Sequence, residues 1–236
     1  FLEDYSEKVG RPETCCDDLF VSYGAYEGYK NCPTENFYAY FSELKQWANM
    51  EKKDAVVSDI KEKAEYHLGE ECSIEQKILN PIEVYAYYIG LYINNMRNGI
   101  YLKYMMSFPV KYSKAAKELI RSSFEKGLKK SLPATVVEDA EIMPKFTVEY
   151  QISEPAAYAV TALEQSGFKP ADENEKYLYG IFDFGGGTTD FDFGVWRGAD
   201  DDEFDKFNCD YVLECFGADS DVRLGGENIL EMLAYQ

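Results

Sequence analysis

The sequence predicts an α/β fold in which helices pack on a sheet. The first observation is composition: 46% of the 236 residues are apolar, and a chain of this length can bury a sizeable core in one large or two smaller domains. The second is order, because helix-like and strand-like segments alternate from Asn80 onward. The third is a glycine-rich turn between two strand-like runs near the C-terminal end.

The first 80 residues or so are polar and turn-rich, and they carry the weakest pattern. The stretch "GAYEGYKNCPTENF" is typical of a loop, since glycine, proline, asparagine and charged residues interrupt every apolar run. The stretch "YFSELKQWANMEKKD" predicts a short amphipathic helix. We expect residues 1–79 to form a helical or irregular part of their own.

A packed helix is predicted over "NPIEVYAYYIGLYINNM". Asn80 can cap it, Pro81 suits its first turn, and Glu83 completes a capping-box pattern. Helical spacing places five apolar side chains on one face: Ile82, Tyr85, Ile89, Ile93 and Met96.

Strand and helix then alternate. "YLKYMMSFPV" predicts a buried strand that stops at Pro109, and Ser113 opens a second helix. The inner side of that helix is expected to carry Leu119, Ile120, Phe124 and Leu128. "KFTVEYQIS" predicts another strand, followed by a helix with Ser153 as its cap and Gly167 as its stop. The acidic "GADDDEFDKF" is typical of an exposed hairpin tip.

Charge and cysteine content narrow the classes of function. A formal net charge of −19 repels nucleic-acid backbones and anionic membranes, so we expect neither as a partner. The lysines between Lys111 and Lys130 alternate with Glu118 and Glu125, which favours a solvated helix face. The run "VYAYYIGLYI" is too short and too rich in tyrosine to span a bilayer.

A zinc site is not expected, because the six cysteines lack C-x-x-C spacing and His67 is the single histidine. A disulfide framework is conceivable but unnecessary at this size. The sequence favours reduced thiols in a cytoplasmic protein.

The stretch "YLYGIFDFGGGTTDFDFGVW" carries the functional signal. Strand-like alternation on both sides of the glycines, and the lack of a lysine after them, indicate a hairpin and not a Walker-type loop. Successive glycine N–H groups can form a nest for phosphate oxygens. Asp183 and Asp190 at the mouth of the turn then predict a bridging magnesium ion, and Thr188 adds a hydroxyl. The alternative is a tight hairpin whose glycines supply positive φ and whose aspartates cap amides.

Four segments together resemble the seventy-kilodalton heat-shock chaperones, within the actin-like ATPase superfamily. "FDFGGGTTD" is similar to the second phosphate-binding hairpin of that family, whose consensus reads DLGGGTFD. "MSFPVKYSKAAKELIRSSFEKGL" resembles its strand, "VPAYF" turn and helix, "ISEPAAYAV" its "NEPTAAA", and "GADSDVRLGGENI" its "GDTHLGGEDF". The resemblance covers about Asn80 to Gln236, and the earlier residues match only through "YFSELKQWAN".

The resemblance implies an actin-like ATPase (ribonuclease H-like) fold that binds ATP or ADP with Mg²⁺. It implies a first-lobe subdomain over residues 80–175 and the start of a second lobe over 176–236. The parent protein would be a chaperone ATPase whose absent domains bind a client peptide or co-chaperone. The alternative is a non-catalytic interaction module that keeps the fold without turnover.

Roles follow from the resemblance position by position. Asp183 would hold magnesium-bound waters or orient the attacking water, with Asp190 and Glu154 on the same water shell; Asp183 and Asp190 are the expected metal residues. The expected phosphate and nucleotide contacts are Gly185, Gly186, Gly187, Thr188, Gly225 and Gly226, and Thr188 is also an expected catalytic residue.

Three positions carry alternatives. Glu154 also suits the first turn of any helix through the helix dipole. Pro109 would couple the nucleotide state to other domains, although a strand terminator explains it nearly as well. Lys45, the remaining expected catalytic residue, lies on an amphipathic helix where lysine is usually solvated.

The sequence also departs from the family. A first phosphate hairpin of the D-x-G-T type is not found before Asn80, and the segments that hold adenosine do not follow "GGENILEMLAYQ". Ser153 and Ala156 replace the family's Asn and Thr. We therefore expect an incomplete nucleotide site in this chain.

Overall fold

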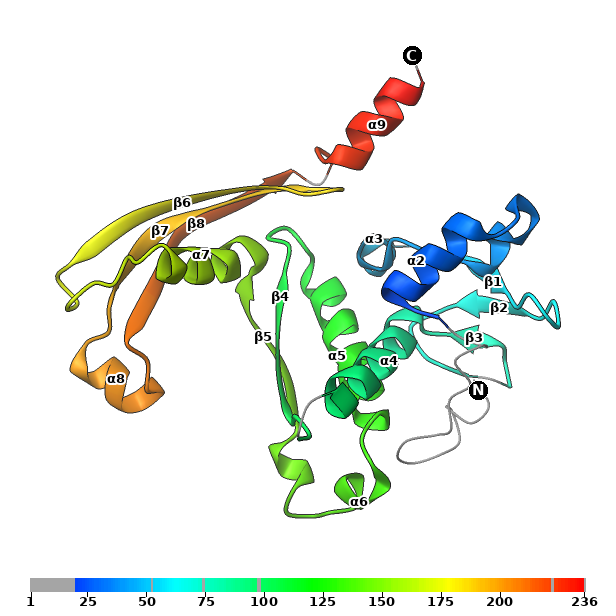
Figure 1. Ribbon diagram of the computed structural model, residues 1–236, viewed down its shortest axis with the longest axis horizontal. Coiled ribbons are helices and arrows are strands. Elements are labelled where there is room, and N and C mark those ends of the chain that lie inside the picture. Colours follow the sequence, from blue (N-terminus) through cyan, green and yellow to red (C-terminus); the bar gives the residue numbers. More distant parts are fainter. Residues whose placement is uncertain (1–19, 52, 74, 97–98, 222, 236) are drawn as a thin grey trace. The chain divides into compact units, whose positions relative to one another are not determined.

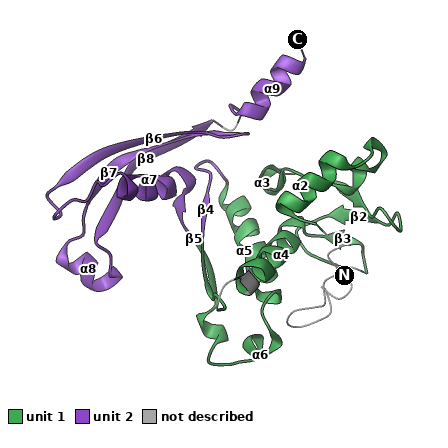
Figure 2. Ribbon diagram, viewed as in Figure 1, with its two compact units in different colours: residues 1–105, 113–149 green, residues 106–112, 150–236 purple. Residues whose placement is uncertain are grey.

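The computed structural model describes residues 20–51, 53–73, 75–96, 99–221 and 223–235 (Figure 1). It shows a mixed α/β protein, which confirms the predicted class. The chain divides into two compact units (Figure 2): unit 1 contains residues 1–105 and 113–149, and unit 2 contains residues 106–112 and 150–236. The boundary falls inside two paired strands, β4 (Lys103–Phe108) and β5 (Thr147–Ser153). The three-part division expected from the sequence stays a prediction.

Unit 1 combines a small sheet with a helix pair. Strand β1 (Val56–Ser58) runs antiparallel to β2 (Glu65–Leu68), and β2 runs parallel to β3 (Ile78–Leu79). Its elements, besides parts of β4 and β5, are α2 (Ser22–Asn31), η1 (Thr34–Ala39), α3 (Leu44–Asn49), β1 (Val56–Ser58), β2 (Glu65–Leu68), β3 (Ile78–Leu79), α4 (Pro81–Met96), α5 (Lys114–Lys130), α6 (Ala134–Val137) and η2 (Met143–Lys145).

The prediction of a loop over "GAYEGYKNCPTENF" is wrong, because this segment forms most of α2 and the start of η1. Aromatic packing stabilises the two segments against each other: the Tyr29 ring lies 4.8 Å from Phe37 and 5.6 Å from Tyr40. Gly28 lets the Tyr40 ring approach α2 closely. These contacts between neighbouring segments outweigh the weak helix propensity of glycine and tyrosine. The short helix expected next is confirmed as α3, although it spans fewer residues than the predicted pattern.

The start of α4 confirms the predicted cap. The Asn80 side chain accepts hydrogen bonds from the N–H groups of Ile82 and Glu83, at 3.0 and 3.1 Å. The Glu83 carboxylate forms an ion pair with Lys130 of α5 at 3.1 Å. Ser113 likewise caps α5 by accepting from Ala116 N–H, as predicted.

The buried side of α4 differs from the apolar face expected from its sequence. Ile82 is buried, but Tyr85, Ile89 and Ile93 are only half-buried, and the helix buries other residues more completely: Glu83, Val84, Ala86, Tyr87, Gly90 and Asn94. On α5 the buried residues are Ala116, Ile120, Ser123, Gly127 and Leu128, so Leu119 and Phe124 are also only partly covered.

Two glycines explain why α4 and α5 bury other sides than their apolar patterns predict. A Cβ added at Gly127 would lie 2.2 Å from the Glu83 carbonyl oxygen, and one at Gly90 would lie 2.2 Å from Ser131 Oγ. Two helices can approach so closely only where a side chain is missing, so the glycines and not the largest apolar residues decide which sides meet.

We expect Gly127→Ala to destabilise the protein by about 1–3 kcal/mol, because the new methyl group meets backbone that has no room to move. Chemical denaturation measures the free energy of unfolding. Gly24→Ala in α2 is the matched control: its Cβ would meet only a Phe20 ring carbon at 3.7 Å, so the usual helix preference for alanine should leave stability equal or raised. Equal effects of the two substitutions would contradict the proposed close contact.

Unit 2 is built on a three-stranded antiparallel sheet in the order β6-β7-β8. Its elements, besides parts of β4 and β5, are β6 (Lys176–Phe184), β7 (Thr189–Gly198), α8 (Asp201–Phe207), β8 (Tyr211–Asp221), α7 (Glu154–Gln165) and α9 (Gly226–Ala234). Helix α7 packs on one face of the sheet (Figure 1), where Phe168 O accepts from Trp196 Nε1 at 2.8 Å. The predicted start of α7 after Ser153, and its stop at Gly167 with φ of 81°, are confirmed.

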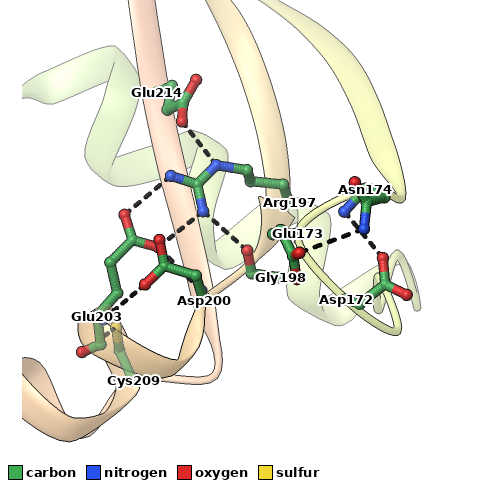
Figure 3. Close-up of polar contacts among 9 residues, drawn as sticks. All are labelled: Asp172, Glu173, Asn174, Arg197, Gly198, Asp200, Glu203, Cys209 and Glu214. Carbon is green, nitrogen blue, oxygen red and sulfur yellow. Dashed lines mark hydrogen bonds and ion pairs between the residues drawn. The ribbon is translucent and has the colours of Figure 1, made fainter.

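The acidic segment is exposed between two antiparallel strands, but it forms helix α8 and not a simple hairpin tip. Asp200 and Glu203 form a reciprocal capping box, which satisfies the first amides of the helix. Arg197 of β7 anchors this helix (Figure 3). Its guanidinium contacts both Glu203 oxygens at 2.7 and 2.8 Å and Glu214 of β8 at 2.6 Å.

Arg197 lowers the pKa of the Glu203 carboxyl to about 2, and the Asp200 N–H adds to this effect. A glutamate in the unfolded chain has a pKa of about 4.3. Ionised Glu203 therefore stabilises the folded protein above that pH, and this stabilisation is lost as the pH falls toward 2. We expect Glu203→Gln to lower the melting temperature at pH 7, with a difference from wild type that shrinks below about pH 4.

Asp205→Asn is the matched control, since it removes a carboxylate from the same helix that forms no ion pair with a described residue. Thermal unfolding between pH 7 and pH 2.5 separates the two variants. A Glu203→Gln difference that does not change with pH would contradict the coupling.

The described residues also bear on membrane-spanning helices and on the pairing of the cysteines. In the described part, no helix is long and apolar enough to cross a membrane. Cys32, Cys72, Cys209 and Cys215 are free thiols, whereas Cys15 and Cys16 lie outside the described residues.

Candidate functional site

The glycine turn joins β6 to β7 in unit 2, and the predicted hairpin is confirmed. Asp183 and Asp190 are directly opposite each other in the antiparallel register, with the glycines between the two strands. Residues 189–198 form a strand, so the turn does not lead into a helix as a Walker-type loop does. Opposed residues of an antiparallel pair project to the same face, so both carboxylates lie on the face that α7 covers.

Several backbone groups of the glycine turn already form hydrogen bonds within the chain. Gly185 N–H closes the turn by donating to Thr188 O at 2.8 Å. The carbonyls of Gly185 and Gly186 accept from the first two amides of α9, Gly226 N–H at 3.0 Å and Glu227 N–H at 2.8 Å.

The N–H groups of Gly186, Gly187 and Thr188 donate to no other described residue. Successive amides of this kind can bind an anion, because no side chain at the glycines blocks its approach.

Gly225 and Gly226 lie next to this turn, and their expected place beside a nucleotide stays a prediction. A Cβ added at Gly225 would lie 2.3 Å from Gly186 O, whereas one at Gly226 would meet only Gly185 O at 3.9 Å. Just before them, the Leu224 carbonyl accepts from Thr189 Oγ1 at 2.5 Å. The start of α9 is therefore joined to the glycine turn by backbone contacts on several atoms.

Asp190 is 2% exposed and connects three segments of unit 2. Its Oδ2 accepts from Thr188 Oγ1 at 2.9 Å, within the turn. Its Oδ1 accepts from Val110 N–H at 3.4 Å, directly after the buried Pro109 that follows β4. A buried carboxylate needs such donors, because leaving it unpaired would cost several kcal/mol.

Asp192 is a second buried aspartate, which the sequence reasoning missed. It is 1% exposed and accepts from the Tyr179 hydroxyl at 2.6 Å, Ser153 Oγ at 3.1 Å and Cys215 Sγ at 3.3 Å. Ser153 Oγ also accepts from Ala156 N–H and so caps α7. The signal was present in "TDFDF", since aspartates two residues apart on a strand share the face opposite the phenylalanines.

Glu154 begins α7 immediately after β5, as predicted. Its position is tied to the sheet by the Ser153–Asp192 hydrogen bond. Burial, together with the negative charges of Glu154 and Asp190, raises the pKa of the Tyr112 hydroxyl to about 12. Glu154 and Asp190 are therefore both near enough to Tyr112 to act on its hydroxyl electrostatically. Tyr112 is a second member of this site that the sequence reasoning did not single out.

Negative charge dominates the surroundings of the turn. Asp183 is exposed and Glu154 half-buried, and the Glu227 carboxyl lies 3.8 Å from the Cβ position of Gly186. Among the described residues, no group of three or more Asp, Glu, His or Cys side chains could hold a metal ion directly. Lys45 is exposed on α3 of unit 1, and its catalytic role stays a prediction.

We expect Gly225→Ala to displace the glycine turn from α9, because its methyl group would overlap the Gly186 carbonyl. Gly226→Ala is the matched control on the neighbouring residue, where space is available. Hydrogen exchange at the Gly226 and Glu227 amides should speed up at least about tenfold in Gly225→Ala, matching a loss of roughly 1.4 kcal/mol, and stay near wild type in Gly226→Ala. Equal protection in both variants would contradict the contact.

The geometry supports two kinds of binding side by side: an oxyanion at the free amides of the turn, and a hydrated cation beside the opposed aspartates. Comparison with models of protein families and with curated proteins found no match to this chain.

Proposed function

We propose that this chain binds the phosphate groups of a magnesium–nucleoside triphosphate at its glycine turn. The observation that carries the proposal is the pairing of Gly186, Gly187 and Thr188 amides, which donate to no other described residue, with Asp190, a buried carboxylate next to them. Amides of this kind favour phosphate oxygens, and a carboxylate beside phosphate requires a cation between the two.

The residues fit a magnesium ion held through its own water molecules. Both Asp190 oxygens already accept hydrogen bonds from Val110 and Thr188, which leaves little capacity for direct ligation. Magnesium keeps several waters in most protein sites and is commonly held by one or two carboxylates together with substrate phosphates. Asp183, exposed and directly opposite Asp190, is the accessible carboxylate of the pair.

At the level of family, we propose a nucleotide-binding domain of the actin-like ATPase superfamily, from a heat-shock-70-like chaperone. Three features of unit 2 support this: the glycine hairpin, the helix that begins at Glu154, and the helix that begins at Gly226 after "RLGG". In such an ATPase, water attacks the γ-phosphate and ADP leaves. Catalysis comes mainly from positioning and from electrostatic stabilisation of the transferred group.

Within this scheme each residue has a defined task. The amides of the turn would hold the β and γ phosphates, and Thr188 would add its hydroxyl. Asp183, Asp190 and Glu154 would orient water around the metal. Magnesium, when bound, would screen the phosphate charge from these carboxylates.

An interaction module without turnover is the second candidate. The face of the β6-β7-β8 sheet opposite α7 carries Leu178, Phe182, Phe184, Phe191 and Phe193, which are between 40% and 81% exposed. Helix α7 packs on the opposite face of this sheet (Figure 1). An apolar patch of this kind marks a contact surface for protein.

We expect this chain to bind magnesium-ATP with a dissociation constant near or above about 1 mM, and not to hydrolyse it at a useful rate. The net charge of −19 and the carboxylates around the turn oppose a polyanion. Titration of ¹⁵N-labelled protein should shift the amide signals of Gly186, Gly187 and Thr188 first.

Gly186→Val should abolish these shifts, because its side chain covers the amides. Gly180→Val on β6 is the matched control, since a Cβ there meets nothing within 4 Å, and it should bind as wild type does. Shifts spread over the exposed sheet face with none at the turn would overturn the nucleotide proposal. Micromolar affinity, abolished by Asp183→Ala, would show a complete site.

A further inference from the structure

Ser220 of β8 carries a buried hydroxyl without a partner. The residue is 3% exposed, and its Oγ forms no hydrogen bond within the described chain. A buried polar atom left unpaired costs roughly 1–3 kcal/mol, so such atoms usually have a protein, water or ligand partner. The sequence reasoning gave this serine no role.

The position of Ser220 relates it to the candidate site. It is directly opposite Asp190 in the β7–β8 register, so both side chains project to the face that α7 covers. Asp183 is opposite Asp190 on the other neighbouring strand. Asp190 thus lies between Asp183 on β6 and Ser220 on β8, in one row across the sheet.

Asp190 already receives hydrogen bonds from Val110 N–H and Thr188 Oγ1. Ser220 is the residue opposite Asp190 on β8, and its hydroxyl forms no hydrogen bond within the described chain. A hydroxyl can donate one hydrogen bond and accept two, so it can bond either a phosphate oxygen or a metal-bound water. An oxygen atom of a ligand bound at this site can supply the missing partner.

We propose that Ser220 is a further ligand-binding residue of this site, whose hydroxyl bonds the oxygen shell of a magnesium–polyphosphate complex next to Asp190. The proposal rests on the proposed function, since it assigns the missing partner to that ligand. It adds a hydroxyl group from β8 to a site made of backbone amides, carboxylates and the Thr188 hydroxyl.

Removal of the hydroxyl tests the proposal. In the free protein Ser220→Ala removes an unsatisfied polar atom, so the melting temperature should stay unchanged or rise. With the ligand, the lost hydrogen bond to a charged group should weaken binding about tenfold. NMR titration with magnesium-ATP, and separately with magnesium tripolyphosphate, measures the affinity of both proteins through the Gly186 and Gly187 amides.

Ser131→Ala is the matched control in unit 1. Ser131 is fully buried, but its hydroxyl donates to Leu128 O at 2.6 Å, so this variant should lose stability and keep wild-type affinity.

The outcomes separate the two proposals. Wild-type binding that Ser220→Ala weakens, at unchanged stability, supports the role of Ser220. Equal affinities of Ser220→Ala and wild type overturn it and leave the proposed function intact. A lower melting temperature of Ser220→Ala shows a structural hydroxyl and also overturns it. No binding of either probe by wild type overturns both proposals.

Discussion

Two buried aspartates on one face of β7 hold unit 2 together. Burial of a carboxylate is costly, and the cost is offset only when donors surround it. Asp190 takes its donors from Val110 and from Thr188, and Asp192 takes donors from Ser153 and Tyr179. The donors come from segments far apart in the sequence, so the demand of two carboxylates for hydrogen bonds fixes where the glycine turn, the residues after β4 and the start of α7 lie.

The same arrangement joins structure to the proposed chemistry. Asp192 does not line the glycine turn, yet it fixes the Ser153 hydroxyl that caps α7 and so sets the position of Glu154. The carbonyls of Gly185 and Gly186 accept hydrogen bonds from α9, whereas the amides of Gly186, Gly187 and Thr188 donate to no other described residue. A site that combines such amides with carboxylates can receive an anion and a cation together, as the proposed metal–phosphate complex requires.

Glycine acts differently in the two units. Gly127 on α5 brings two helix backbones together and has a purely structural reason, because its missing side chain makes room for Glu83 O. Gly225 makes equivalent room for the glycine turn. Gly186 has an ordinary amount of space around it, so packing does not require a glycine there.

The sequence by itself determined the local features of this protein. The caps at Asn80, Ser113 and Ser153 and the hairpin around Gly185–Gly187 are confirmed, because capping, turn formation and strand alternation depend on neighbours in the sequence. The exposed nature of the acidic segment before β8 also followed from its charge, although its helix did not.

Tertiary structure decided what sequence neighbours do not control. Which side of α4 is buried depends on Gly127 of another helix, and the helical state of "GAYEGYKNCPTENF" depends on ring packing with Phe37 and Tyr40. The sequence also could not predict the hydrogen bonds of Asp192 or the unpaired hydroxyl of Ser220. A buried carboxylate and an unpaired hydroxyl differ from exposed ones only through the strands and helices that cover them, and those come from distant parts of the chain.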